Sequence, residues 1–144
     1  MKPLLVILIA AFLPLASVAQ DAAFAPVPAS EVVLADLLFL KRVVVVFADS
    51  PNDPDYIHQM ELLAEDTADL VERDTIVVTD TNPADLTELR RTLRPRGFSL
   101  VILDKDGKTA LRKPLPWHTR EITHAIDKFP SRPIEVQERN PPGR

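Results

Sequence analysis

An apolar run from Val43 to Phe47 is the clearest pattern in the chain, and a polar segment over 49–53 soon follows it. A short run of β-branched residues that is bounded by turn-forming residues predicts a buried central strand. Asp53, Pro54 and Asp55 then favour a helix start, because they suit the cap, the first helical position and the positive end of the helix dipole. The pattern therefore predicts a strand that leads through a short loop into a helix.

The spacing of apolar positions predicts the other elements in the same way. They are a short helix after Ser30, a long helix from Asp53 with apolar positions up to Leu70, a strand over Thr75–Thr79, a helix from Asn82 to Leu93, a strand over Phe98–Leu103, a hairpin turn over 104–108, a strand over Ala110–Lys113 and a helix from Thr119 to Phe129. In the helix after Asn82, Leu86 and Leu89 are expected to face the core, and Arg90 and Arg91 to face solvent.

The two ends of the chain differ from this middle part. The first 19 residues have a basic start, an apolar middle and small residues at Ser17 and Ala19, which is typical of a secretory signal peptide. An uncleaved anchor is less favoured, because the apolar run of about a dozen residues is shorter than the ~17 that a membrane span needs. The expected organisation is a signal peptide over 1–19, an N-terminal lead-in over 20–36, one domain over 37–132 and a flexible tail over 133–144. The expected location is the periplasm or outside the cell, with no stable membrane insertion after signal cleavage.

The order strand, helix, strand, helix, strand, strand, helix restricts the topology. Two strands joined through a helix are expected to be parallel with a right-handed crossover, and a hairpin adds an antiparallel pair. This order predicts an α/β fold of the thioredoxin-like βαβαββα type, with a mixed four-stranded sheet and helices on both faces. In such a sheet the loops over 49–53, 79–83, 94–98 and 113–118 meet at one edge.

Sheet edges of this kind often bind ligands in α/β folds. The residues expected around a site there are Asp49, Ser50, Asn52, Arg96, Phe98, Lys113, Trp117 and Arg120. Each has a structural alternative. Trp117 is also explained as a core or lid residue, and Arg94 and Arg96 as arginines that pair with carboxylates or free carbonyls at a helix end.

Charge is unevenly distributed along the chain, which has a formal net charge of −4. Residues 20–85 contain 14 acidic and 3 basic residues, whereas residues 86–144 contain 7 acidic and 13 basic ones. One interpretation is that acidic and basic faces complement each other within the fold, and the other is that a basic surface receives an anionic partner. The acidic balance makes nucleic acid an unexpected partner.

Several motifs between residues 37 and 132 resemble those of one family. They are Arg42 with the strand after it, Tyr56 with Gln59, Glu72-Arg73-Asp74, Leu93-Arg94-Pro95-Arg96-Gly97-Phe98, Lys105-Asp106-Gly107, Arg112-Lys113-Pro114, Pro116-Trp117, Arg120-Glu121-Ile122 and Ile126-Asp127-Lys128. The chain resembles the thioredoxin-like domain of unknown function found in secreted bacterial proteins and, as extracellular modules, in vertebrate sushi-repeat and related matrix proteins. The resemblance implies an extracellular binding role and gives no activity.

Thiol chemistry is excluded because the chain contains no cysteine. The segment 50–53, Ser-Pro-Asn-Asp, stands where a thioredoxin has its Cys-x-x-Cys, and Gly97-Phe98 stands where it has a cis-proline. A serine hydroxyl neither forms a disulfide nor ionises at neutral pH, so the chain is neither a thiol-disulfide oxidoreductase nor a cysteine peroxidase.

Other chemistry has weak support in the sequence. Asp49 with Asp53, or Ser50 with His58, lacks a third orienting residue. The three histidines lack a metal spacing, and the Asp104 turn has Leu115 where a calcium loop has glutamate. We therefore expect no cofactor, no metal and no catalytic residue. The favoured function is a non-catalytic binding module for an envelope or extracellular protein or an anionic ligand, and the alternatives are a cysteine-independent envelope enzyme and a small anion-binding protein.

Overall fold

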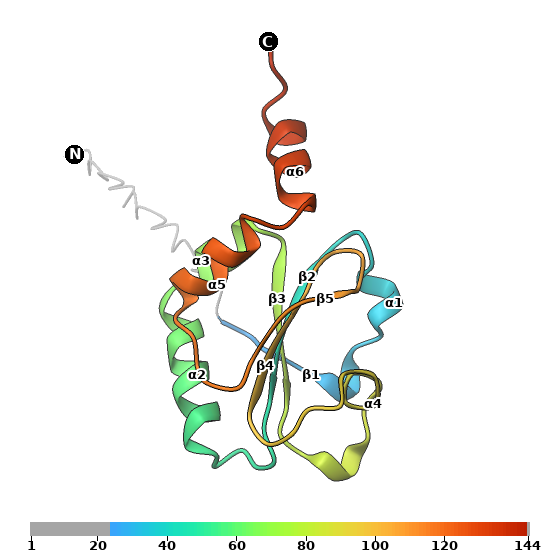
Figure 1. Cartoon of the computed structure of the whole chain (residues 1–144), viewed down its shortest axis with the longest axis vertical. Helices are drawn as coiled ribbons and strands as arrows, with labels where there is room; N and C mark the ends of the chain where they lie inside the picture. Colours follow the sequence, from blue (N-terminus) through green and yellow to red (C-terminus); the bar gives the residue numbers. More distant parts are fainter. Residues whose placement is uncertain (1–23, 144) are drawn as a thin grey trace, which may run out of the picture.

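The computed structural model describes residues 24–143, and the predicted signal peptide over 1–19 lies outside them. A single sheet has the strand order β1-β3-β2-β4-β5. The strands are β1 (Val27–Pro28), β2 (Arg42–Phe47), β3 (Thr75–Asp80), β4 (Ser99–Leu103) and β5 (Thr109–Lys113). The helices are η1 (Ala29–Glu31), α1 (Leu34–Leu37), α2 (Pro54–Glu65), α3 (Thr67–Glu72), η2 (Pro83–Asp85), α4 (Glu88–Leu93), α5 (Thr119–Ile126) and α6 (Ser131–Arg139) (Figure 1).

Strand β2 lies at the centre of the sheet, as its apolar run predicts, and every residue in it is buried. It runs parallel to β3 and antiparallel to β4, and β4 runs antiparallel to β5. The predicted pairing of these four strands is confirmed. The sheet has a fifth strand, however, because β1 pairs in parallel with Val78 and Thr79 of β3. Pro28 is tolerated because β1 is an edge strand, and the outer side of an edge strand makes no hydrogen bonds to another strand.

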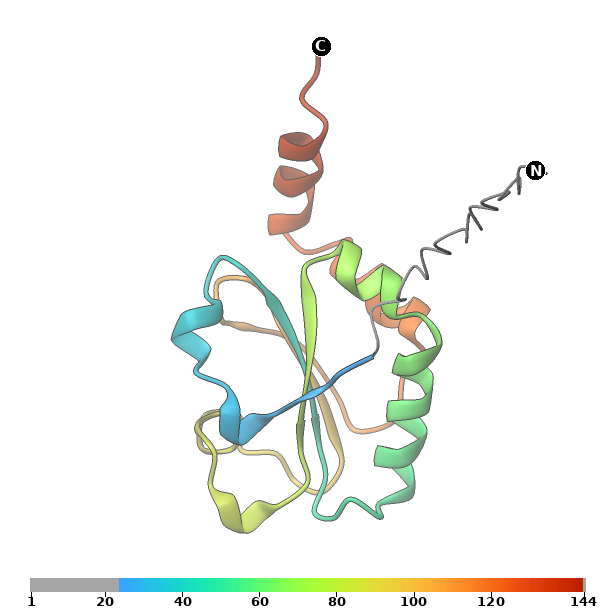
Figure 2. The same cartoon turned by 180° about the vertical axis from the view of Figure 1, so that it is seen from behind.

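Helices cover both faces of the sheet (Figures 1 and 2). Alternate residues of β2 point to opposite faces, so Val44 and Val46 pack with side chains of α2, α3 and α5. Val43 and Val45 pack in a second cluster with side chains of η1, α1 and α4. The two clusters place a helical layer on each side of the strands.

Helix α2 begins as the sequence predicts. The side chain of Asp53 accepts hydrogen bonds from the backbone N–H groups of Asp55 and Tyr56, and Pro54 occupies the first helical position. The single long helix that was expected up to Leu70 is two helices, because the backbone leaves the helical conformation at Asp66. The cap at Asp53 nevertheless fixes where the loop from β2 ends.

Two predicted orientations are wrong. Leu86 is exposed and has a left-handed backbone conformation after η2, whereas Arg90 is buried against a carboxylate. Thr119 is the first residue of α5, as the predicted helix start implies. Its buried hydroxyl donates to the carbonyl of Leu62 at 2.6 Å, while the backbone N–H of His118 donates to the Glu121 carboxylate.

Both ends of the described chain are more structured than expected. Residues 24–29, predicted as a loose lead-in, contribute β1 and the first residue of η1, and Phe24 packs on the core beside α3. Residues 133–139, predicted as the start of a flexible tail, belong to α6. This helix stands at one end of the sheet (Figure 1), where its Glu135 binds the buried Arg42. Within residues 24–143, no helix is long and apolar enough to cross a membrane.

Candidate functional site

The strand register brings the four predicted loops to one edge of the sheet. Phe47 pairs with Asp80 on one side and with Ser99 on the other, and Leu100 pairs with Lys113. The ends of β2, β3 and β5 and the start of β4 therefore lie together, at the lower end of the sheet in Figure 1. We call this end the loop edge. The predicted convergence is confirmed, whereas the binding role of the residues stays a prediction.

Several polar side chains of the loop over 49–53 form hydrogen bonds within the loop or to the start of α2. The Ser50 hydroxyl accepts the backbone N–H of Asn52 at 3.1 Å, and Asp53 caps α2. Asp49 and Asn52 are exposed. The loop therefore offers one carboxylate and one amide to solvent, while Ser50 is already engaged as a turn residue.

A buried ion pair lies beneath the loop edge. Asp80 accepts hydrogen bonds from Arg90 Nε at 3.1 Å and Nη2 at 2.8 Å, and from the Thr87 hydroxyl at 2.7 Å. Arg90 also donates to the carbonyl of Ala48 at 3.1 Å, and its guanidinium lies 5.4 Å from the centre of the Phe47 ring. Because these groups come from β2, β3 and α4, the pair holds the loops after both central strands in place.

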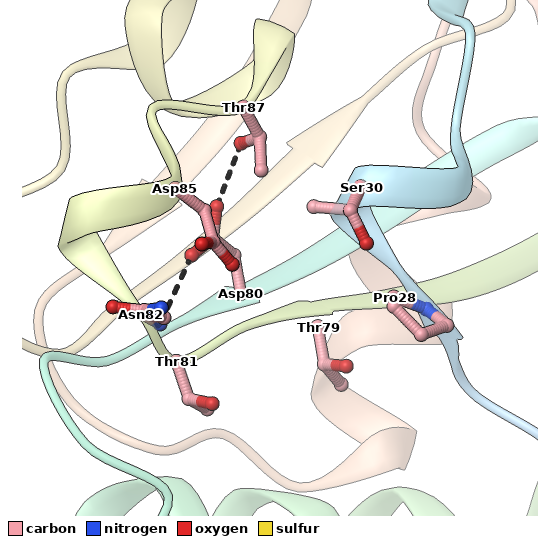
Figure 3. Close-up of a pocket in the computed structure, with 9 residues that line it drawn as sticks. Pro28, Ser30, Thr79, Asp80, Thr81, Asn82, Asp85 and Thr87 are labelled. Carbon is pink, nitrogen blue, oxygen red and sulfur yellow. Dashed lines mark hydrogen bonds between the residues drawn. The ribbon is translucent and has the colours of Figure 1, made fainter.

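A polar hollow of about 250 Å³ opens beside this pair, between η1 and the loop after β3. Figure 3 shows Thr87 and Asn82 on either side of Asp80, with Ser30 across the hollow. The lining residues are Pro28, Ala29, Ser30, Thr79, Asp80, Thr81, Asn82, Asp85 and Thr87. The loop over 79–83 was predicted but this hollow was not, because its opposite wall includes Pro28 and Ala29, which were predicted to belong to a loose lead-in.

Trp117 is fixed by a buried glutamine. Gln59 is fully buried in α2, and its amide accepts the backbone N–H of Trp117 and donates to its carbonyl, both at 2.8 Å. The half-buried indole packs on the core, and the ammonium of Lys113 lies 4.3 Å from the centre of its ring. Trp117 therefore packs partly buried on the core, as its structural alternative describes, and its binding role stays a prediction.

Cationic side chains gather around the start of β4 and the end of β5. Arg94 and Arg96 are exposed in the loop before β4, and Arg112 donates to the carbonyl of Leu93 at 2.6 Å, at the end of α4. We call Arg94, Arg96, Arg112 and Lys113 the basic rim. Arg120 is exposed in the first turn of α5, beside an open hollow that it lines with His118 and Glu121. Phe98 does not belong to this surface, because it is buried in the core between the sheet and α5.

The opposite end of the sheet has a different electrostatic arrangement. Arg42 is fully buried and donates to Asp104 at 3.0 Å and to both oxygens of Glu135, at 2.6 and 3.1 Å. Lys105 also pairs with Glu135, at 2.8 Å, and Arg132 pairs with it at 3.3 Å. Burial acts to raise the pKa of Glu135, but its hydrogen bonds from Arg42 and Lys105 outweigh burial and lower that pKa to about 2. We call these residues the ion-pair cluster.

The basic rim lacks such partners. Among residues 24–143, none of its four cations lies in a salt bridge, whereas Arg42, Arg73, Arg132 and Arg139 each do. The uneven charge of the sequence therefore has two outcomes in the fold. Acidic and basic groups neutralise each other at the ion-pair cluster, whereas the four cations of the basic rim lie outside any salt bridge among residues 24–143.

Catalytic and metal chemistry receive no geometric support in the described chain. His58 lies on the surface, 4.0 Å from Glu61, and Ser50 bonds to its own loop. Within residues 24–143, no group of three or more histidine or carboxylate side chains is arranged to hold a metal ion. The described groups at the loop edge can donate hydrogen bonds and attract anions.

The sequence profile described as "Domain of unknown function (DUF4174)" matches residues 33–135, most of the chain. The chain belongs to this family. No curated protein matches the chain. The boundaries of the DUF4174 match extend to Glu135, so they include the first half of α6 together with its contact to Arg42.

Solved thioredoxin-like proteins are similar to the DUF4174 domain in fold. Chloroplastic thioredoxin z shares 20% identity at a TM-score of 0.51, over 66% of this chain and 81% of that one. A reduced 2-Cys peroxiredoxin of Plasmodium vivax shares 12% at a TM-score of 0.55, over 74% and 84%. The exposed lipoprotein thioredoxin of Streptococcus pneumoniae shares 16% at a TM-score of 0.52, over 67% and 90%. These similarities establish a thioredoxin-like α/β fold, and this DUF4174 domain has that fold without cysteine.

Proposed function

We propose that the DUF4174 domain is a non-catalytic binding module that holds an anionic partner at the basic rim. The observation that carries the proposal is the set of four rim cations without a salt bridge among residues 24–143, at the edge where thioredoxin-like folds bring their loops together. Exposed guanidinium groups bind sulfate, phosphate or carboxylate oxygens with paired hydrogen bonds, which makes an anion the best-matched ligand.

The geometry of the rim supports binding more than catalysis. Arg112 is held against Leu93 and Lys113 lies over Trp117, so two of the cations have a fixed position before a ligand arrives. A binding site gains affinity when its groups need little ordering. Of the candidate catalytic groups in the loop over 49–53, Ser50 and Asp53 are engaged by their own loop and by α2, which leaves Asp49 as the exposed carboxylate.

Calorimetric titration with sucrose octasulfate tests this proposal, and uncharged sucrose is the control ligand. The protein is expected to bind the sulfated sugar and not sucrose, with an affinity that falls as salt is added, because the rim is exposed and its charges are screened. Replacing both Arg94 and Arg96 by alanine is expected to weaken binding about tenfold or more, since hydrogen bonds to charged groups contribute about 1.5–3 kcal/mol each.

Two further variants keep this test specific. Lys113→Ala removes a rim cation and leaves the indole of Trp117 on the core, so it is expected to weaken binding without unfolding the domain. Lys128→Ala removes an exposed cation outside the rim and is expected to leave binding unchanged. Equal binding by wild type and by the Arg94/Arg96 variant would rule out the basic rim as the site.

We further propose that the domain acts in the periplasm or outside the cell. The signal-like pattern of residues 1–19 supports this location. N-terminal sequencing of the protein recovered from a periplasmic extract is expected to begin near Gln20. Recovery of the uncleaved chain from the cytoplasm alone would contradict the proposed location.

A further inference from the structure

A second surface lies at the opposite end of the sheet from the loop edge, where the turn over 38–40 meets the β4–β5 hairpin. Phe39 is 75% exposed and has a left-handed backbone conformation with φ of 61°. Such a conformation is unfavourable for a residue with a large side chain and persists only where the surrounding structure enforces it. An aromatic side chain held in this way away from the core needs an explanation other than packing within the fold.

The hairpin holds this turn rigidly. The backbone N–H of Phe39 donates to the carbonyl of Lys105 at 2.7 Å. Leu38 packs so closely on Gly107 that a Cβ atom there would lie 2.7 Å from the leucine methyl group. The backbone that carries the Phe39 ring therefore has a fixed position, so burying the ring in an interface requires little ordering of the turn.

An apolar hollow of about 410 Å³ lies directly beside the ring. Phe39, Ala110, Pro130 and Ile134 line it, and the side chain of Ile134 on α6 is 59% exposed. The same patch therefore carries a protruding aromatic side chain and a hollow next to it. A surface with both features can pair with a second copy of itself, since a two-fold axis brings the ring of each copy to the hollow of the other.

The charges around the patch favour the same partner. Asp106 and Lys108 are exposed at the hairpin tip, and neither lies in a salt bridge among residues 24–143. The carboxylate of Asp106 accepts the backbone N–H of Lys108 at 2.9 Å, and the Lys108 ammonium is exposed beside it. A two-fold axis near the hairpin tip would bring Asp106 of each copy to Lys108 of the other, which would make the edge of the patch self-complementary in charge. Lys105 is not available for such pairing, because it binds Asp74 and Glu135 within its own chain.

We infer that the protein forms a two-fold dimer in which Phe39 of each copy fills the Ile134 hollow of the other. This inference does not depend on the proposed function. The interface lies at the hairpin end of β5 and the basic rim at the other end, so both rims of the dimer stay open. Two open rims would let one dimer hold a partner at two points, which strengthens binding to any partner with repeated anionic groups.

Sedimentation velocity at protein concentrations from about 1 to about 100 µM tests the inference, because dimers form by mass action. The wild type is expected to change from monomer to dimer across this range. Phe39→Ser is expected to weaken the dimer about 100-fold, as expected for a buried aromatic at the centre of an interface. Leu86→Ser is the matched control, since Leu86 is also exposed at 61% and left-handed but lies outside the patch. Circular dichroism confirms that both variants are folded.

Charge exchange tests the two-fold geometry. Lys108→Glu and Asp106→Lys each place like charges across the axis and are expected to weaken the dimer about tenfold. An equimolar mixture of these two variants is expected to restore dimers, because each copy then faces an opposite charge at both positions. The inference would be overturned if the wild type stays monomeric or if the mixture of charge variants stays monomeric. It would also be overturned if Phe39→Ser leaves the dimer intact or if Leu86→Ser dissociates it as well.

Discussion

Replacing Arg42 by alanine is expected to lower the free energy of unfolding by about 3–5 kcal/mol, because removal of one partner leaves buried charges uncompensated. Arg42 is fully buried and is the shared partner of Asp104 and Glu135. It also donates to the Ser131 hydroxyl and to the carbonyl of Arg73, so the variant removes five hydrogen bonds at once. Chemical denaturation at neutral pH measures the loss.

Two controls separate charge from hydrogen-bond geometry in this experiment. Arg42→Lys keeps the charge but loses the planar group that binds both Glu135 oxygens, so it is expected to recover part of the lost stability. Arg91→Ala removes an exposed arginine and is expected to change stability by about 0.5 kcal/mol or less. A loss below about 1 kcal/mol in Arg42→Ala would mean that the ion-pair cluster does not hold α6 to the domain.

Acid is expected to weaken the same cluster. The pKa of Glu135 is about 2 in the folded protein and 4.5 as its ordinary value, so unfolding at low pH takes up a proton. Its contribution to stability is therefore fully present above pH 4.5 and is lost as the pH falls toward 2. A shift of this size corresponds to about 3 kcal/mol.

Glu135→Gln isolates this contribution, because the amide does not titrate. The difference in the free energy of unfolding between wild type and Glu135→Gln is expected to be largest near pH 6 and to shrink between pH 5 and pH 2. Asp74 and Asp127 also have lowered pKa values, through Lys105 and Arg73 respectively, so both proteins lose some stability in acid. A difference that stays constant with pH would show that Glu135 is not stabilised as a carboxylate.

The elements that local patterns control could be predicted from the sequence. The apolar run of β2, the cap at Asp53 and the turn between β4 and β5 depend on neighbouring residues, and all three are present in the structure. The convergence of the four loops followed from element order and strand direction alone. Only the edge strand β1 was missing from the predicted sheet, since its segment lacks the alternating β-branched pattern.

Long-range polar contacts account for the errors. Helix α6 has few apolar positions, and it is held by Glu135, which binds an arginine 93 residues earlier in the sequence. Arg90 is buried because Asp80 and the carbonyl of Ala48 receive its guanidinium, which helical periodicity alone does not indicate. Local sequence patterns do not indicate such distant partners. Arg90 was therefore predicted to face solvent, and residues 133–139 of α6 to belong to a flexible tail.

The candidate site was predicted in part for the same reason. Arg96 and Lys113 lie at the loop edge as expected, but Phe98 fills the core, and Trp117 is held by Gln59 beneath Lys113. Gln59 of the Tyr56 and Gln59 motif therefore has a structural role, because its amide holds the backbone of Trp117 in place. The rim is distinguished by its position, because the fold brings four cations outside any salt bridge among residues 24–143 to the ends of β4 and β5, next to the other loops.

The most direct test of the binding account is an amide chemical-shift titration of the protein with sucrose octasulfate, with sucrose as the control ligand. The account predicts saturable shifts in residues 94–98, 112–114 and 117–120 that sucrose does not cause, and little change around Arg42 and Glu135. Shifts that cluster at Arg42 and Glu135, or a response no larger than that to sucrose, would contradict it.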